Sequence, residues 1–168
     1  MKKIELVYRE ILYRAMEKKE FVLTQSELSK NLGISLSIIN KAVNRLNELG
    51  AVKIVQRNFK VLDIKKILFL WASIRNLNKD IILKTRVEMP VREVERNMPD
   101  KVVFTAYSAY KFKFKDVPAD YSEVYVYANP QDIEEIKKRF FNDKDQSTIR
   151  PNLFILKKDT LIEKYDYI

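Results

Sequence analysis

The chain has 168 residues, a formal net charge of +9, no Cys, no His and only two Gly. Without Cys and His it lacks disulfides, a thiolate nucleophile, the usual ligands of transition metals, and the commonest general base near neutral pH. Two glycines cannot supply a dinucleotide-binding or phosphate-binding glycine loop, and neither pattern occurs. We therefore expect no metal, no cofactor and no enzymatic activity, and a protein that acts by binding.

The apolar segments are too short for a membrane span. The longest run extends from Ile67 to Ile74 and is interrupted only by Ser73, about a third to half of the length that a transmembrane helix needs. The N-terminus is charged and leads directly into an amphipathic pattern, unlike a secretory signal. The sequence predicts a soluble, cytoplasmic protein with no membrane partner.

Positive charge is concentrated near the N-terminus. Residues 1–62 contain 12 Lys and Arg and 6 Asp and Glu, a net charge of +6, whereas residues 63–168 contain 20 and 17, a net charge of +3. A basic excess in one small module is typical of a protein that binds a polyanion. General solubility is the alternative explanation of the same charge.

The first helices and turns follow the order of a helix-turn-helix. Apolar residues at spacings of three and four predict a helix over residues 3–18. After a β-prone run at 21–23, Thr24 and Glu27 form the pattern of a capping box, which predicts the start of a second helix. Gly33 can end that helix in the left-handed conformation.

A third helix is predicted over residues 36–49, with Ser35 as its N-cap and Gly50 just past its end. Its apolar residues (Leu36, Ile39, Val43, Leu46 and Leu49) share one face. Two β-prone segments, 52–57 and 59–64, then predict a hairpin that turns near Asn58, because Asn tolerates positive φ. Residues 1–62 are therefore predicted to be a winged helix-turn-helix domain.

The polar face of helix 36–49 predicts double-stranded DNA binding, because a helix fits the major groove and amide and guanidinium groups can read base edges there. The candidate residues at this helix are Ser35, Ser37, Asn40, Lys41, Asn44 and Arg45, and those of the hairpin are Lys53, Gln56, Arg57, Asn58 and Lys60. Two alternatives remain open. The helix can simply be amphipathic with a solvated face, or the winged helix can bind protein.

Residues 63–168 predict a small α/β domain, because strand-like and helix-like segments alternate. Residues 63–77 read as a helix that could connect the modules, 80–89 as a strand, 101–104 as β-prone, 123–127 as a strand, 130–141 as an amphipathic helix and 152–156 as a buried strand. Pro90 begins a short helix that ends before Pro99. Residues 105–115 fit a strand or a helix equally, and 142–150 read as a loop.

Three segments carry a resemblance to a known family: 104–110 (Phe-Thr-Ala-Tyr-Ser-Ala-Tyr), 118–127 (Pro-Ala-Asp-Tyr-Ser-Glu-Val-Tyr-Val-Tyr) and 150–156 (Arg-Pro-Asn-Leu-Phe-Ile-Leu). With the winged helix, they resemble archaeal winged helix-turn-helix regulators whose C-terminal domain is AbiEi-like, as in the antitoxins of type IV toxin–antitoxin systems. The resemblance implies a DNA-binding regulator that can repress its own operon and a C-terminal domain that can engage a toxin.

Two other functions for the second module are weaker. A nucleotidyltransferase site needs a Gly-Ser turn and two carboxylates that bind magnesium; here Glu123 is the one candidate carboxylate, and Tyr125 stands where the second should be. Aromatic residues interleaved with lysines (Tyr107, Tyr110, Phe112 and Phe114, with Lys111, Lys113 and Lys115) suggest stacking on single-stranded nucleic acid. An aromatic core with a lysine rim is the favoured explanation of that cluster.

The overall expectation is a mixed α+β or α/β chain with a DNA-binding domain at 1–62 and an effector, partner-binding or dimerisation domain at 63–168. We expect a homodimeric, sequence-specific transcriptional repressor, because one winged helix covers few base pairs. The alternative is an antitoxin or protein-interaction module that neutralises a toxin partner, with DNA binding secondary.

Overall fold

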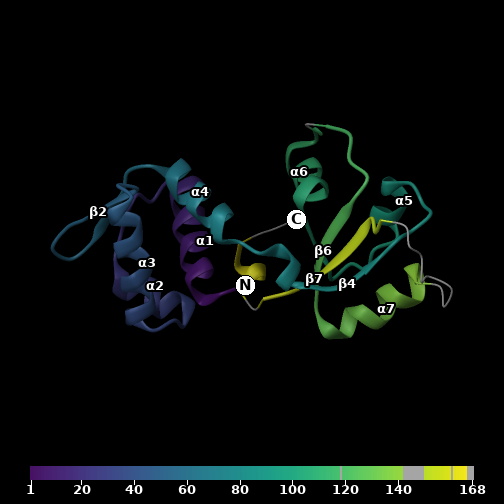
Figure 1. Cartoon of the computed structure of the whole chain (residues 1–168), viewed down its shortest axis with the longest axis horizontal. Coiled ribbons are helices and arrows are strands. Elements are labelled where there is room, and N and C mark those ends of the chain that lie inside the picture. The colour runs from purple at the N-terminus through teal and green to yellow at the C-terminus, as the bar shows by residue number, and fades with distance from the viewer. Residues whose placement is uncertain (118, 142–149, 160, 166–168) are drawn as a thin grey trace. The chain divides into compact units, whose positions relative to one another are not determined.

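The computed structural model describes residues 1–117, 119–141, 150–159 and 161–165. The chain divides into two compact units, Met1–Asn76 and Leu77–Ile168, which are described separately (Figure 1). Both units combine helices with a β-sheet, which confirms the mixed α+β fold class.

The N-terminal unit has the helix and strand order of a winged helix-turn-helix. Three helices pack around a short sheet: α1 (Lys3–Met16), α2 (Gln25–Leu32) and α3 (Leu36–Glu48). The antiparallel sheet has the order β1-β3-β2, formed by β1 (Val22–Leu23), β2 (Val52–Ile54) and β3 (Phe59–Val61). In Figure 1 the loop between β2 and β3 extends away from the helices of its unit as the wing.

The turns of this unit form at the predicted residues. Thr24 caps α2, its hydroxyl accepting a hydrogen bond from the Glu27 amide over 3.2 Å. Gly33 and Gly50 follow α2 and α3 with φ of 61° and 63°, a conformation that costs glycine little. Glu27 does not complete the capping box, because its carboxylate instead pairs with Arg14 of α1, with 2.5 Å between Oε1 and Nη1.

The wing and the ends of α3 differ from the expectation. The loop between β2 and β3 spans four residues, 55–58, closed by a 2.8 Å hydrogen bond from the Val55 amide to the Asn58 carbonyl. Such a loop is wider than the tight turn that needs positive φ, and Asn58 does not adopt one. Leu36 and Leu49, which were assigned to the apolar face of α3, are 50% and 45% exposed because they lie at its two ends.

The first compact unit extends beyond the predicted boundary at residue 62. Helix α4 (Ile64–Ile74) packs against α1, and Ile67 is fully buried. Arg75, directly after α4, pairs with Glu5 of α1 across 3.1 Å. Residues 63–76 therefore belong to the N-terminal unit, because α4 packs on α1 and Arg75 pairs with the buried Glu5.

The C-terminal unit is built on one four-stranded sheet of order β4-β7-β6-β5, in which only β6 and β7 are parallel. Its elements are η1 (Leu77–Lys79), β4 (Ile81–Thr85), α5 (Val91–Arg96), β5 (Val103–Thr105), α6 (Ala106–Phe114), β6 (Val124–Ala128), α7 (Pro130–Phe140), β7 (Leu153–Lys157) and η2 (Ile162–Tyr165). The alternation of strands and helices agrees with the expectation. Pro90 lies at the N-cap of α5 and not at its first helical position.

The core of this unit lies between one face of the sheet and helices α5 and α7. Alternate residues of β6 (Val124, Val126 and Ala128) point into it and pack with Val94 of α5 and Ile136 of α7. The ambiguous segment 105–115 forms helix α6, which begins at Ala106 with φ of 53°. The loop predicted at 142–150 lies mostly outside the described residues, which resume at 150.

Candidate nucleic-acid interface

The difference in net charge between the two parts of the chain is larger when the chain is divided at the boundary of its compact units. Met1–Asn76 contains 15 Lys and Arg and 7 Asp and Glu, a net charge of +8, because Lys65, Lys66 and Arg75 fall on this side of the boundary. Leu77–Ile168 contains 17 and 16, a net charge of +1. Nearly all of the excess charge therefore belongs to the unit with the helix-turn-helix, where it favours association with a polyanion.

Helix α3 separates its apolar and polar residues cleanly. Ile39, Ala42, Val43 and Leu46 are fully buried and anchor the helix to its unit. The polar candidates at this helix are all exposed: Ser35, Ser37, Asn40, Lys41, Asn44 and Arg45. The 3.6-residue period produces this separation, so the structure brings these six residues onto one accessible surface.

The two asparagines of this surface belong to a chain of hydrogen-bonded amides. Asn44 donates from Nδ2 to Oδ1 of Asn40 over 2.8 Å, and Asn40 donates from Nδ2 to Oε1 of Gln25 over 3.2 Å. Gln25 is the first residue of α2, so the first helix of the motif orients side chains on the second. Gln25 could not be identified as a site residue from the sequence alone, because its partner lies 15 residues away on another helix.

The polar surface of α3 borders a hollow of about 510 Å³. It is lined by Ile4 of α1 together with Ser37, Asn40, Lys41, Asn44, Arg45 and Glu48 of α3. Amides, a hydroxyl and two cations thus surround one open depression, which suits contact with base edges and phosphate oxygens.

The start of α3 leaves polar groups available. Ser35 is the N-cap, but its side chain makes no capping hydrogen bond, and both Ser35 and Ser37 are exposed. Helix N-termini attract anions through their unsatisfied amides and the helix dipole. Exposed Leu36 lies between the two serines, where an apolar side chain can contact a thymine methyl group.

The wing carries three exposed cations. Lys53 and Lys60 are cross-strand partners on β2 and β3, and Arg57 lies in the loop between them. Asn58 is half-buried, so it is the least accessible of the predicted wing residues. Asn47 of α3 holds the hairpin in place, since its Oδ1 accepts a 3.1 Å hydrogen bond from the Ile54 amide.

Tyr8 of α1 is a further group close to this surface. Its side chain is fully buried, and its hydroxyl makes no hydrogen bond to the described residues. Burial raises the pKa of the hydroxyl above its ordinary value, and the nearby positive charge of Arg45 opposes that rise. Tyr8 was not identified as a site residue from the sequence, because it is one of several apolar residues along α1.

The carboxylate proposed for a nucleotidyltransferase site is engaged by other side chains. Glu123 accepts a hydrogen bond from the Tyr125 hydroxyl over 2.8 Å and from Arg150 over 2.7 Å. In the described part of the chain, no group of three or more acidic side chains is placed to hold a metal ion. Likewise, no helix there is long and apolar enough to cross a bilayer.

Most of the aromatic cluster of the C-terminal unit is not the buried core that was favoured, although Phe112 is half-buried and packs on Phe104. Tyr107, Tyr110 and Phe114 are 45%, 41% and 57% exposed on α6. Several rings already contact other rings: Tyr107 stacks on Tyr121, and Tyr110 lies against Phe114. The cluster is therefore a partly self-packed surface.

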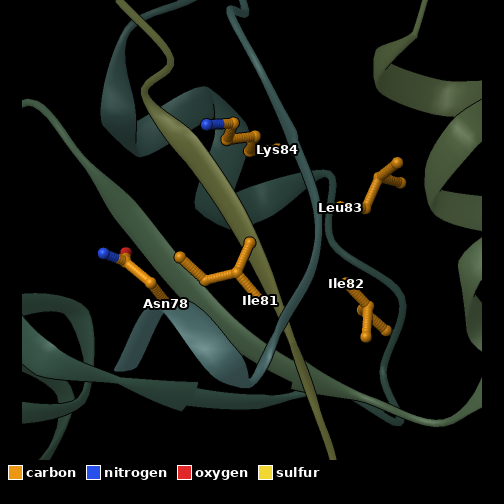
Figure 2. Close-up of a pocket in the computed structure, with 5 residues that line it drawn as sticks. All are labelled: Asn78, Ile81, Ile82, Leu83 and Lys84. Atoms are coloured by element: carbon orange, nitrogen blue, oxygen red, sulfur yellow. The ribbon is translucent and has the colours of Figure 1, made fainter. Parts of the chain in front are cut away.

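A second hollow, of about 580 Å³, lies at the edge strand β4 (Figure 2). Asn78, Ile81, Ile82, Leu83 and Lys84 line it. Ile82 and Lys84 are exposed, whereas Ile81 and Leu83, which alternate with them along the strand, are half-buried. One segment, residues 78–84, supplies the entire lining, with the Asn78 amide and the charged Lys84 among apolar side chains. The β-bulge at Ile82 and the exposed Lys84 also disfavour pairing with another strand.

The comparisons with known proteins agree with the N-terminal unit. Residues 8–58 match the family described as HTH domain, which supports a helix-turn-helix DNA-binding regulator. The match runs from α1 through the wing loop and does not reach the C-terminal unit, whose AbiEi-like character and archaeal origin stay predictions. The chain matches no curated protein and no solved structure. The matched residues include the whole of α3 and every residue that lines the hollow beside it except Ile4.

Proposed function

We propose that the protein is a sequence-specific regulator that inserts α3 into the major groove of double-stranded DNA. The observation that carries the proposal is the amide chain Gln25–Asn40–Asn44, whose two asparagines lie beside Lys41 and Arg45 on the exposed face of α3. Side chains held in place lose less conformational entropy on binding than free ones. Asparagine can contact adenine through two hydrogen bonds, and arginine can contact guanine in the same way.

The wing and the N-terminus of α3 supply the second part of this proposal. Lys53, Arg57 and Lys60 provide charge for adjacent phosphates, and Ser35 and Ser37 provide hydroxyls beside the free amides of the helix. Contacts of this kind fix the orientation of a protein on the duplex without reading sequence. We further propose that two copies bind a two-fold operator and that occupancy represses transcription, because a single winged helix spans few base pairs.

The experiment is selection from a random duplex library followed by affinity measurements on the selected site and on a scrambled duplex. The wild-type chain should enrich one sequence and bind it with an affinity that falls steeply as salt rises. Asn44→Ala and Arg45→Ala should weaken binding to the selected site far more than to the scrambled duplex, since each bidentate base contact discriminates by about 1–3 kcal/mol.

The matched control is Lys138→Ala, which removes one exposed cation from α7 of the other unit. It should leave both affinities unchanged if binding occurs through α3. Equal losses on both duplexes for the α3 variants would reassign Asn44 and Arg45 to phosphate contact. A wild-type chain that binds no duplex at low salt would refute DNA binding altogether, and a reporter that is unaffected by the protein would refute repression.

A further inference from the structure

The Tyr8 hydroxyl is an anomaly at the interface of α1 and α3. Its side chain is fully buried, and no described group hydrogen-bonds to its oxygen. Leaving a buried polar group without a partner is costly, and phenylalanine would fill the same space without that cost. We therefore look for a function of this hydroxyl in a complex of the protein with a partner.

Arg45 is the charged side chain that the structure places near this hydroxyl. Helices α1 and α3 pack together, and Ile4, one turn before Tyr8 on α1, lines the same hollow as Arg45. Burial raises the pKa of the Tyr8 hydroxyl, and the positive charge of Arg45 opposes that rise, in agreement with this placement. Tyr8 is thus located behind the surface that carries Arg45.

We propose that Tyr8 is a positioning residue for DNA recognition, its phenolic oxygen accepting a hydrogen bond from the Arg45 guanidinium in the duplex complex. The inference rests on the proposed function, because it concerns the docked state of α3. In the free protein Arg45 is exposed and water can satisfy its donors. Docking removes that water, and the guanidinium donors that do not face DNA then need an acceptor within the protein.

A neutral acceptor suits this task better than a carboxylate. Guanidinium carries five N–H donors in a fixed plane, so one edge can contact a base while another contacts the protein. A phenolic oxygen fixes that plane and leaves the positive charge intact for guanine or phosphate. Glu48 also lines the hollow, but a carboxylate paired with Arg45 would cancel part of the charge that attracts DNA.

The test is Tyr8→Phe, which deletes the hydroxyl and keeps the ring. We expect affinity for the selected duplex to fall roughly tenfold, the effect of one hydrogen bond to a charged group, while affinity for a scrambled duplex stays unchanged. The melting temperature should stay the same or rise, because a buried hydroxyl without a partner has been removed. Tyr13→Phe, which makes the same change at a half-buried position of α1, should alter neither affinity.

A double-mutant cycle separates positioning from packing. In an Arg45→Ala background, Tyr8→Phe should have no further effect on the selected duplex, because the group that it positions is gone. The inference is overturned if Tyr8→Phe binds the selected duplex like the wild type, or if the two substitutions act additively, or if affinity falls only together with the melting temperature. A wild-type chain that selects no duplex would instead refute the proposed function itself.

Discussion

Arg75, which follows α4, donates a hydrogen bond from Nη1 to Oε2 of Glu5 in α1 over 3.1 Å, a contact between residues 70 positions apart. The Glu5 side chain is 3% exposed and the Arg75 side chain 15% exposed. A buried carboxylate and a buried guanidinium are stable only as partners, because each charge has lost most of its water. The pair therefore fixes α4 on α1.

We expect Glu5→Ala to lower the free energy of unfolding of the N-terminal unit by about 3 kcal/mol, because it leaves Arg75 buried without this carboxylate. Urea unfolding followed by the fluorescence of Trp71, the single tryptophan of the chain and a residue of α4, measures the change. Glu17→Ala, at an exposed position just after α1, is the control and should change little. An equal effect of both would show that the pair contributes no more than a surface charge.

Gln25→Ala should weaken binding to the selected duplex several-fold although Gln25 need not touch DNA. Its side chain holds Asn40, which in turn holds Asn44, and each exposed hydrogen bond of this type is worth about 1 kcal/mol. Anisotropy of a labelled duplex measures the loss. Gln56→Ala, at an exposed position in the wing loop, removes the same side chain outside the amide chain; it should lower affinity on all sequences alike or not at all.

The wing should contribute affinity without specificity. Replacing Lys53, Arg57 and Lys60 by Ala should weaken binding to selected and scrambled duplexes by the same factor. The slope of log K against log salt should become shallower by about 0.9 for each lost phosphate contact. A loss confined to the selected duplex would mean that the wing reads bases, and an unchanged slope would remove it from the interface.

The sequence was sufficient to predict features that depend on local physics. The period of apolar residues placed α3 and its exposed polar face, and the two glycines marked the ends of α2 and α3. The role of Thr24 as the N-cap of α2 was predicted in the same way. Exposure on α3 does not establish contact, so the DNA-binding roles of these residues stay predictions.

Features that depend on distant partners could not be predicted in the same way. Glu5 and Gln25 are ordinary helix residues until Arg75 and Asn40 are placed beside them. The boundary at residue 62 was drawn too early because the apolar stripe of residues 63–77 does not show which unit it packs against, and its partner, α1, is distant in the sequence. Segment 105–115 stayed ambiguous since its aromatic residues and lysines alternate as in a strand, whereas its structure is a helix with exposed rings.

Tyr125 should be among the last tyrosines to ionise. Burial raises the pKa of its hydroxyl to about 12, and the hydrogen bond to Glu123 and the charge of that carboxylate act in the same direction. Since the ordinary pKa is about 10, the folded state favours the protonated phenol. This contribution to stability is complete below pH 10 and is lost as the pH rises through 12.

The absorbance of tyrosinate at 295 nm measures this titration. Tyr125→Phe should remove one group that ionises near pH 12, and Glu123→Gln should shift that group toward 10. The free energy of unfolding of the wild type should fall more between pH 10 and 12 than that of Tyr125→Phe. A Tyr125→Phe spectrum that loses intensity near pH 10 instead would contradict the raised pKa.

Glu95 should be the most sensitive charged residue of the C-terminal unit. Its buried carboxylate accepts hydrogen bonds from Lys111 of α6 and from the Tyr121 hydroxyl, each over 2.5 Å. These bonds join α5, α6 and the segment before β6. The pKa of Lys111 is raised by its hydrogen bond to Glu95, so the lysine is held in its charged form.

Glu95→Ala should therefore lower the free energy of unfolding of this unit by about 2 kcal/mol, less than for a wholly buried pair because the Lys111 side chain is 26% exposed. Hydrogen exchange of α6 amides, measured by mass spectrometry on the full chain, isolates the effect from the N-terminal unit. Glu93→Ala, an exposed carboxylate on the same helix, is the control. Unchanged protection of α6 in Glu95→Ala would contradict this prediction. It would show that the ion pair with Lys111 is not needed to hold α6 and that the packing of Tyr107, Tyr110 and Phe114 is sufficient.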